Sequence, residues 1–404
     1  MKDSETQRNS LMREAAIPLE SVLLFMAGIT MLITGALLFP VSSGRLDYNE
    51  SGLYGLLLVF FAVQTITMGK TPFGEARRSI PVLVAGVLLA VVGIATCFVP
   101  DLYAWLPRLL LSVFFGLGGL AQLLRMLIDE DKFRTWKRHG GLFDHLIAGC
   151  AAVYLLQIGL AALILCRNLL SVGWTAVIVL AFGVALVYLA AVIWRIYSLY
   201  VEKDAPDAPG ARLNISTDNA LMMVVGMYMF VLGILLMPVN MGLLPFSGSA
   251  QLGLLMVLFA IQMLALGATP LGQFRRSWPI ILAGLLFASL GIVSCVIPEV
   301  LVSALTYLIG ALNVLGGSIG IIRVVSPLVG QTRSPGEPLS PIRRRLDAAQ
   351  LIMNALTVLF GVSMLISGLI PGLVLGGVLA ANGAVLLYMF YLIAVLENPV
   401  EKEE

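Results

Sequence analysis

Hydrophobic residues occur along this chain in long runs that are separated by short polar stretches. Each run reaches roughly 18 residues or more, the length of helix that a hydrocarbon core about 30 Å thick requires. Lipid supplies no hydrogen-bond partner to an open backbone, so such runs predict helices rather than strands. We predict an all-α integral membrane protein with about 12 transmembrane helices, over residues 20–40, 51–69, 79–99, 106–127, 143–166, 172–197, 219–238, 249–267, 278–297, 301–325, 346–370 and 373–396.

Composition agrees with this class and excludes a soluble domain. Of 404 residues, 59% are hydrophobic and 12% are charged, whereas about a quarter of a soluble domain is charged. The four cysteines form no CxxC pair and no metal-binding spacing, so they are interpreted as small packing residues. The stretch around Lys70 lacks the earlier glycine of a phosphate-binding loop, because Thr65 stands there. We expect no enzymatic activity, no cofactor and no nucleic-acid partner.

The basic residues predict the orientation in the membrane. Of 25 Lys and Arg residues, 22 lie at the chain ends or in and beside the even-numbered connections; Arg45, Arg108 and Arg167 lie on the other side. By the positive-inside rule, both termini are cytoplasmic. The cluster Arg343–Arg345 directly precedes a span, where it is a topology determinant and a candidate contact for anionic lipid.

The chain contains two copies of one pattern. A shift of 198 residues superposes residues 59–100 on 257–298, with 20 identities in 42 positions and no gap. Each copy holds an even number of spans, so the copies share one orientation and form parallel six-helix repeats. The predicted parts are a cytoplasmic N-terminal tail (1–19), membrane repeat 1 (20–199), a cytoplasmic linker (200–217), membrane repeat 2 (218–397) and an acidic cytoplasmic tail (398–404).

Glycine pairs mark the odd-numbered spans, except the fifth, which has Gly149 and Gly159 and no terminal proline. Two glycines seven residues apart stack on one helix face, where small residues let helices approach closely in lipid. A proline follows near the outer end, where we expect it to terminate the helix. The pattern predicts helical hairpins grouped three and three; its members are Gly28, Gly35 and Pro40; Gly86, Gly93 and Pro100; Gly226, Gly233 and Pro238; Gly284, Gly291 and Pro298; and Gly361, Gly368 and Pro371.

These features resemble a known family. The glycine pairs followed by proline, the start of the third span in the second copy ("SWPIILAGLLFASLGIVSCVIPE") and the span that follows it ("GGSIGIIRV") look like the HdeD-like acid-resistance membrane protein family. A member of that family is similar to one repeat, so this chain resembles two of them fused in tandem. The resemblance implies a bacterial inner membrane and a link to acid or envelope stress.

The chain is also similar, more weakly, to the major facilitator transporters, which have two parallel halves. The loop after the second span of each half keeps the outer frame of that family's loop, through Gly69, Arg77 and Arg78 and through Gly267, Arg275 and Arg276. Phe73 and Leu271 occupy the acidic position, so the side chain of a gating ion pair is missing. We interpret "GKTPFGEARRSIP" and "GATPLGQFRRSWP" as one basic cytoplasmic corner used twice, with gating as the alternative.

Neutral amides are the polar residues expected deep inside the spans. They are Gln64 and Gln262 at equivalent positions, and Asn313, Asn354, Asn382, Gln122 and Gln157. An amide in hydrocarbon needs a partner, and inter-helix hydrogen bonds worth roughly 0.6–2 kcal/mol each are the structural interpretation. A pore or pocket for a small neutral solute is the functional alternative. The equivalence of Gln64 and Gln262 favours a central position for both.

Titratable residues lie near the ends of the spans. Asp144 and His145 form the one candidate pH-sensitive pair, although a solvated basic segment explains them as well. Asp144, Glu20, Asp218 and Asp347 are expected at helix starts, where the helix dipole and capping favour carboxylates.

The function predicted from the sequence is a non-enzymatic multi-pass inner-membrane protein, which the family resemblance associates with acid or envelope stress tolerance. Two alternatives remain open: a transporter or channel for a small solute, and a membrane scaffold for partner proteins. The lipid bilayer is the expected partner. The sequence determines neither protein partners nor the oligomeric state.

Overall fold

The computed structural model describes residues 17–75, 79–100, 103, 105–128, 141–166, 169–200, 216–329, 341–366 and 368–397. Within these residues it contains 12 helices that are long and apolar enough to cross a membrane, which confirms the predicted class. The helices are α2 (Leu19–Ser42), α3 (Glu50–Met68), α4 (Ile80–Phe98), α5 (Trp105–Ile128), α7 (Leu142–Leu165), α8 (Val172–Tyr200), α9 (Thr217–Asn240), α10 (Gly248–Leu266), α11 (Trp278–Val296), α12 (Val302–Val329), α13 (Pro341–Leu365) and α14 (Gly372–Glu397).

The helix ends agree with the predicted spans to within a few residues, except at α13. This helix covers residues 341–365 instead of 346–370, so Arg343–Arg345 belong to its first turns. α13 ends before residue 370, the predicted end of this span, because the chain leaves the helix before Gly368. The φ of Gly368, +84°, lies in the left-handed region that glycine tolerates. Gly368 therefore lies in the turn after α13, and the predicted glycine pair of this span is wrong.

The prolines do not all end their helices. α4 and α11 stop before Pro100 and Pro298, as predicted. In contrast, α2 continues through Pro40 to Ser42, and α9 continues through Pro238 to Asn240. A proline removes one backbone donor, and at the end of a helix its neighbours still close the last turn. Ser43 N–H, for example, donates to Phe39 O at 3.3 Å.

Helix pairing differs from the predicted hairpins. In both halves the most extensive contacts join the first and sixth helices (α2 with α8, α9 with α14), the second and third (α3 with α4, α10 with α11), and the fourth and fifth (α5 with α7, α12 with α13). We call the end of the bundle at which α2 begins the inner end, after the predicted orientation, and the opposite end the outer end. The second and third helices, and the fourth and fifth, are thus joined at the inner end, not at the outer end as the hairpin prediction required, and the first and sixth are not consecutive in sequence.

Glycine faces explain these pairs. A Cβ added at Gly28 would lie 3.1 Å from Gly183 O on α8 and 2.7 Å from a methyl group of Val187. A Cβ added at Gly93 would lie 3.0 Å from Gly55 O on α3. Side chains there would push the helix backbones apart, so the prediction that the glycines permit close helix approach is confirmed at these sites.

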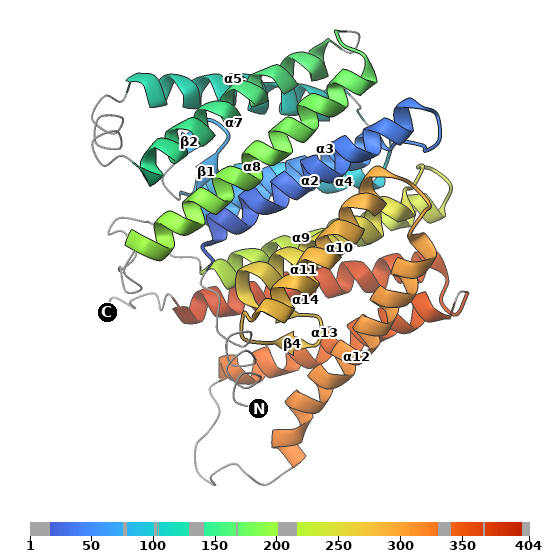
Figure 1. Cartoon of the computed structure of the whole chain (residues 1–404). Helices are drawn as coiled ribbons and strands as arrows, with labels where there is room; N and C mark the ends of the chain where they lie inside the picture. Colours follow the sequence, from blue (N-terminus) through green and yellow to red (C-terminus); the bar gives the residue numbers. More distant parts are fainter. Residues whose placement is uncertain are drawn as a thin grey trace, which may run out of the picture.

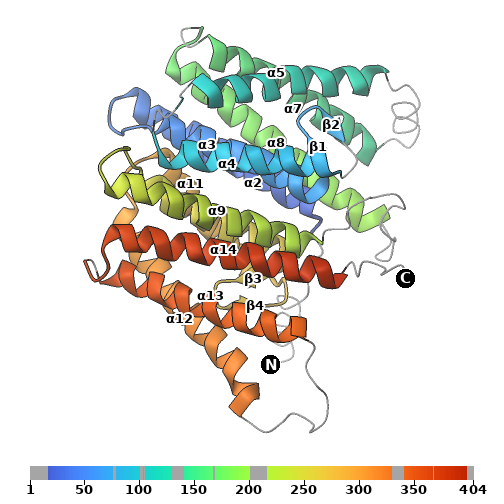
Figure 2. The ribbon, with the colours of Figure 1, turned by 180° about the vertical axis from the view of Figure 1, so that it is seen from behind.

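The two halves meet through α2, α3 and α4 of the first and α9, α10 and α11 of the second. Figure 1 shows the first half in blue to green above the second in yellow to red, and Figure 2 shows α4 beside α9 from behind. Asn49 N–H donates to Val296 O at 2.8 Å, and Ser247 N–H donates to Phe98 O at 2.9 Å. Each bond is the counterpart of the other under the 198-residue shift, so the repeat in the sequence recurs in the contacts.

Two-residue strands form a tight antiparallel hairpin at the inner end of each half. β1 (Lys70–Thr71) pairs with β2 (Gly74–Glu75), and β3 (Ala268–Thr269) pairs with β4 (Gly272–Gln273). In the first hairpin the Thr71 hydroxyl donates to Gly74 O at 2.8 Å, and Gly69 closes the preceding helix with φ +66°. Each basic corner predicted from the sequence therefore begins as a small β-hairpin.

Candidate functional site

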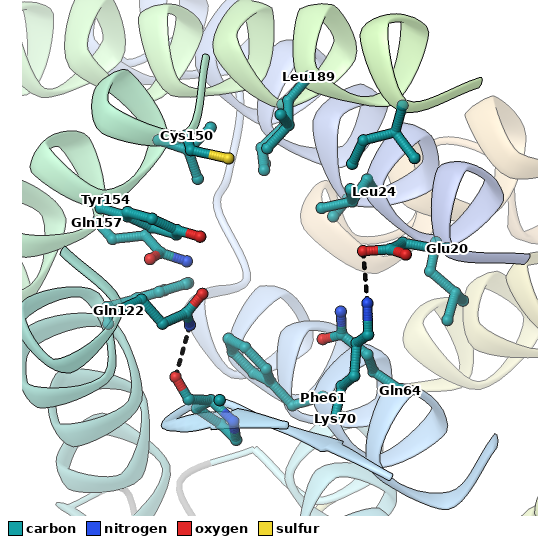
Figure 3. A pocket seen from close by; sticks show the side chains of 18 of the residues that line it. Glu20, Leu24, Phe61, Gln64, Lys70, Gln122, Cys150, Tyr154, Gln157 and Leu189 are labelled. Atoms are coloured by element: carbon teal, nitrogen blue, oxygen red, sulfur yellow. Dashed lines mark hydrogen bonds and ion pairs between the residues drawn. The ribbon is translucent and has the colours of Figure 1, made fainter. Parts of the chain in front are cut away.

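A pocket of about 1120 Å³ lies inside the first half, between α2 and α3 on one side and α5, α7 and α8 on the other. The β1–β2 hairpin contributes Lys70, Thr71, Pro72 and Gly74 to its wall (Figure 3). Glu20, in the first turn of α2, lies at its inner end. Met31 also lines it, 11 residues further along α2 than Glu20, or about 16 Å at the rise of an α-helix. The pocket therefore extends from the inner end well into the bundle.

An ion pair stands on one wall of the pocket. Lys70 Nζ lies 2.6 Å from Glu20 Oε1, and the two side chains are 25% and 21% exposed. Lys70 is held in place by β1, and Glu20 by the first turn of α2, so the pair joins two elements 50 residues apart in sequence. Glu20 is at a helix start as predicted, and its carboxylate also pairs with Lys70, which the capping interpretation did not include.

Amides and a phenol form the opposite wall. Figure 3 shows Gln122, Tyr154 and Gln157 projecting from α5 and α7 toward the side that carries Glu20 and Lys70. Gln122 Nε2 donates to Pro72 O, at the tip of the hairpin, at 2.7 Å. Gln157 Oε1 is buried and accepts no hydrogen bond from the described part of the chain. Buried polar atoms in proteins nearly always have a partner, so Gln157 Oε1 can accept a donor that enters the pocket.

The hairpin folds back along α5 instead of projecting beyond it. A Cβ added at Gly118 would lie 2.7 Å from Pro72 O, and Gly118 is 10 residues, about 15 Å, before the end of α5. Gly74 lies against the guanidinium of Arg125, in the last turn of α5. Non-helical backbone within a membrane bundle is tolerated where it is buried in protein or lines a cavity, and here it does both.

The two glutamines predicted to share a central position are not brought together. Gln64 lines the pocket of the first half, whereas Gln262, half-buried on α10, does not. The six helices that join the halves are packed through buried apolar side chains and aromatic contacts, such as Phe98 with Tyr228 at a centroid distance of 5.6 Å. The pocket thus belongs to one half and does not run between the two.

Asn313, Asn354 and Asn382, the asparagines that were predicted to lie deep in the second half, are buried. Asn313 Nδ2 donates to Ile309 O in its own helix at 2.9 Å, and Asn382 Nδ2 donates to the Thr357 hydroxyl at 3.4 Å across α13 and α14. The side chain of Asn354 packs against Gly320 on α12. These contacts favour the structural interpretation, although Asn354 Nδ2 and Asn382 Oδ1 have no hydrogen-bond partner in the described chain.

Asp144 and His145 lie in the first turn of α7 and are exposed. His145 Nδ1 shares a hydrogen bond with the Tyr188 hydroxyl on α8 at 2.7 Å. Neither residue lines the pocket, so the structure does not connect this candidate pH-sensitive pair with it. Asp347 lies well inside α13, which begins at residue 341, so its predicted place at a helix start is wrong.

The basic corners are only partly described. Arg77 and Arg78 lie outside the described residues. Arg275 is exposed, and Arg276 Nη1 donates to Ile17 O at 3.0 Å, which ties the second-half corner to the segment before α2. Arg343, Arg344 and Arg345 are exposed at the inner end of α13.

Sequence reasoning named the three glutamines of the pocket as candidates, but it gave Lys70 no part in a solute site. The second repeat has Ala268 at the position equivalent to Lys70, and this difference is the signal of a site confined to one half. Gln122 is likewise replaced by Gly320 in the second repeat. A comparison of the polar residues that differ between the repeats would have found both.

The arrangement can bind, orient and exchange hydrogen bonds with a small polar molecule. It offers the Glu20 carboxylate, the cationic side chains of Lys70 and Arg125, amide donors and acceptors, and an apolar lining that includes Leu24 and Phe61. In the described part of the chain, no three His, Cys, Asp or Glu residues lie together in a way that could hold a metal ion. Comparison of the chain with known protein families, with curated proteins and with solved structures finds no match.

Proposed function

We propose that this chain is a non-enzymatic protein of a bacterial inner membrane, with both termini cytoplasmic, that binds a small polar solute in the pocket of its first half. Binding from the inner end makes it a transporter or channel for that solute. Its physiological role is tolerance of acid or envelope stress, a role suggested by the resemblance to the HdeD-like family.

One observation carries the solute-binding proposal: a large pocket inside a membrane bundle is lined by an ion pair, three glutamines and a backbone hairpin. Polar groups are costly in hydrocarbon, and those inside membrane bundles commonly mark solute or ion pathways. Hydrogen bonds between helices suffice to explain isolated amides such as Asn313. They do not explain the Gln157 oxygen on the cavity wall, which has no hydrogen-bond partner within the part of the chain that the structure describes.

The chain carries a natural probe for this pocket. Cys150 lines the cavity, Cys97 and Cys295 are buried, and Cys166 is exposed at the outer end. In a Cys166→Ser chain, a small charged methanethiosulfonate reagent added from the inner side should label Cys150, because water fills the pocket. The Cys150→Ser/Cys166→Ser chain is the control. If Cys150 stays unlabelled while the protein is folded, the pocket is closed to solute and the proposal is wrong.

The stress role needs a separate test in cells. A deletion strain should survive acid shock or envelope-disrupting agents less well than its parent, and the intact gene should restore survival. A gene that encodes Gln122→Leu, which removes the amide donor to Pro72 O, should restore it only in part. Equal survival of the deletion strain and its parent under both stresses would exclude this role and leave the pocket proposal standing.

A further inference from the structure

We propose that the pocket selects a zwitterion: a free amino acid with a neutral, hydrogen-bonding side chain. This inference rests on the proposed function, solute binding in the first half, and names the class of solute.

The ion pair favours a ligand that carries both a positive and a negative charge. Glu20 and Lys70 meet at 2.6 Å, and both side chains are largely withdrawn from water. A ligand with one charge that draws either residue out of this pair breaks a poorly hydrated ion pair, and breaking such a pair is strongly unfavourable. A ligand with a carboxylate for Lys70 and an ammonium for Glu20 compensates both. Arg125, the third charged residue of the lining, is exposed at the end of α5, where water screens its charge.

The opposite wall favours a ligand whose side chain ends in a hydrogen-bond donor. Gln157 Oε1 is a buried acceptor that receives no hydrogen bond from the described residues, and Gln122 and Tyr154 lie beside it (Figure 3). An amide or hydroxyl on the ligand side chain would satisfy it. Leu24, on α2 beside Glu20, and Phe61, on α3, are apolar and match the methylene groups of such a side chain (Figure 3). The volume, about 1120 Å³, exceeds what one amino acid fills, so water completes the site.

The second repeat lacks these features. The 198-residue shift places Asp218 and Ala268 at the positions of Glu20 and Lys70, and Gly320 at that of Gln122. No equivalent charge pair can therefore form there. The same fold of hairpin and helices is present in both halves, so the pair and the amide are not needed to build it.

The test uses the purified full-length chain in detergent and three matched probes. L-glutamine carries both charges and an amide. Glutaramic acid lacks its ammonium, and 4-aminobutanamide lacks its carboxylate. Glutamine should raise the apparent melting temperature in a dose-dependent way, and each truncated analogue should bind roughly tenfold more weakly or worse. Equal stabilisation by glutamine and either analogue would overturn the zwitterion proposal while leaving a solute pocket in place.

Substitutions of Glu20 and Lys70 test whether this ion pair is responsible for glutamine binding. Lys70→Ala, which copies the second repeat, and Glu20→Gln should each weaken glutamine binding by roughly tenfold or more while the unliganded chain keeps its fold. Asp218→Asn, at the equivalent position outside the pocket, is the matched control and should leave binding unchanged. Unchanged binding in Lys70→Ala would overturn the proposal.

A zwitterionic lipid headgroup has similar chemistry, so one arm of the test adds phosphatidylethanolamine or phosphatidylglycerol to the micelles. Glutamine should stabilise the chain in both lipids. Stabilisation by phosphatidylethanolamine alone, lost in Lys70→Ala and without any glutamine effect, would overturn the free amino acid as ligand and assign the pocket to lipid. Failure of every probe, together with an unlabelled Cys150, would instead reject the solute pocket itself.

Discussion

Single residues decide where the helices of this protein touch. Gly233 on α9 faces α14 so closely that an added Cβ would collide with the backbone of Ala380. Gly377 on α14 has no neighbouring atom within 4 Å of its Cβ position. Both are glycines inside apolar helices, and hydrophobicity alone does not distinguish them. The contact partner makes the difference, because a rigid backbone cannot move aside as a flexible side chain can.

The substitution Gly233→Ala should destabilise the protein by about 1–3 kcal/mol, since α9 and α14 must separate to admit the methyl group. Gly377→Ala, the matched control, should be neutral or slightly stabilising, because alanine favours helix by up to about 1 kcal/mol over glycine. The apparent melting temperature of each purified variant measures the difference. Equal shifts in both variants would contradict the close packing of α9 and α14.

Among the elements, the β-hairpins at the inner end are the least expected from the sequence. The motif Gly, Thr-Pro, Gly was predicted to end one helix and begin the next at a cytoplasmic corner. In the structure, Thr71 bonds Gly74 and Thr269 bonds Gly272 in the same way, at 2.8 and 2.9 Å. The tip of each hairpin rests on a glycine of the fourth helix of its half, Gly118 or Gly316. Hairpin and helix therefore form one unit.

The variant Gly118→Ala should displace the β1–β2 hairpin from α5, because the new methyl group would lie 2.7 Å from Pro72 O, a backbone atom. We expect a loss of about 1–3 kcal/mol in stability and a weaker Gln122–Pro72 hydrogen bond. A thermal unfolding series in detergent tests this. Gly159→Ala on α7, where no atom lies within 4 Å, is the control, and a similar loss in that variant would refute the explanation.

In the whole molecule, the two halves form reciprocal contacts. Asn49 caps α3 by accepting from Gly52 N–H, and Ser247 caps α10 by accepting from Ala250 N–H. These two caps, equivalent under the 198-residue shift, meet each other, with Asn49 Nδ2 at 3.4 Å from Ser247 Oγ. The outer ends of the two repeats are therefore joined at equivalent positions.

A cross-link tests that junction. Cys97 and Cys295, which interact across the two halves, are first replaced by Ser in every chain of this test. In the resulting Asn49→Cys/Ser247→Cys chain, with a protease site inserted into the linker at 200–217, mild oxidation should join the two halves through a disulfide. After cleavage, they should migrate together on a non-reducing gel and separately after reduction. Each single substitution serves as a control, and its halves should separate. Separation of the halves in the oxidised double variant would show that the outer ends of the repeats are apart.

Orientation is a second property of the whole molecule. The positive-inside rule places the 43–49 and 241–247 connections outside and the 200–217 linker inside. Alkaline phosphatase fused after Asp47 or Met241 should therefore be active, and phosphatase fused after Ala205 should be inactive. Fluorescent protein fusions at the same positions should show the opposite pattern. The reverse result at either outer position would invert the predicted topology.

The sequence by itself determined the twelve helices, the repeat and the glycine faces, because each depends on local spacing: the length of an apolar run, a shift of 198 residues, and the helical period. Only the tertiary structure decided that α2 pairs with α8 rather than α3, and that Lys70 meets Glu20. Helices in lipid are apolar on every side, so hydrophobicity does not reveal which face meets which neighbour. The pocket arises from that choice of neighbours, which places a carboxylate, an ammonium and three amides from distant segments around one space.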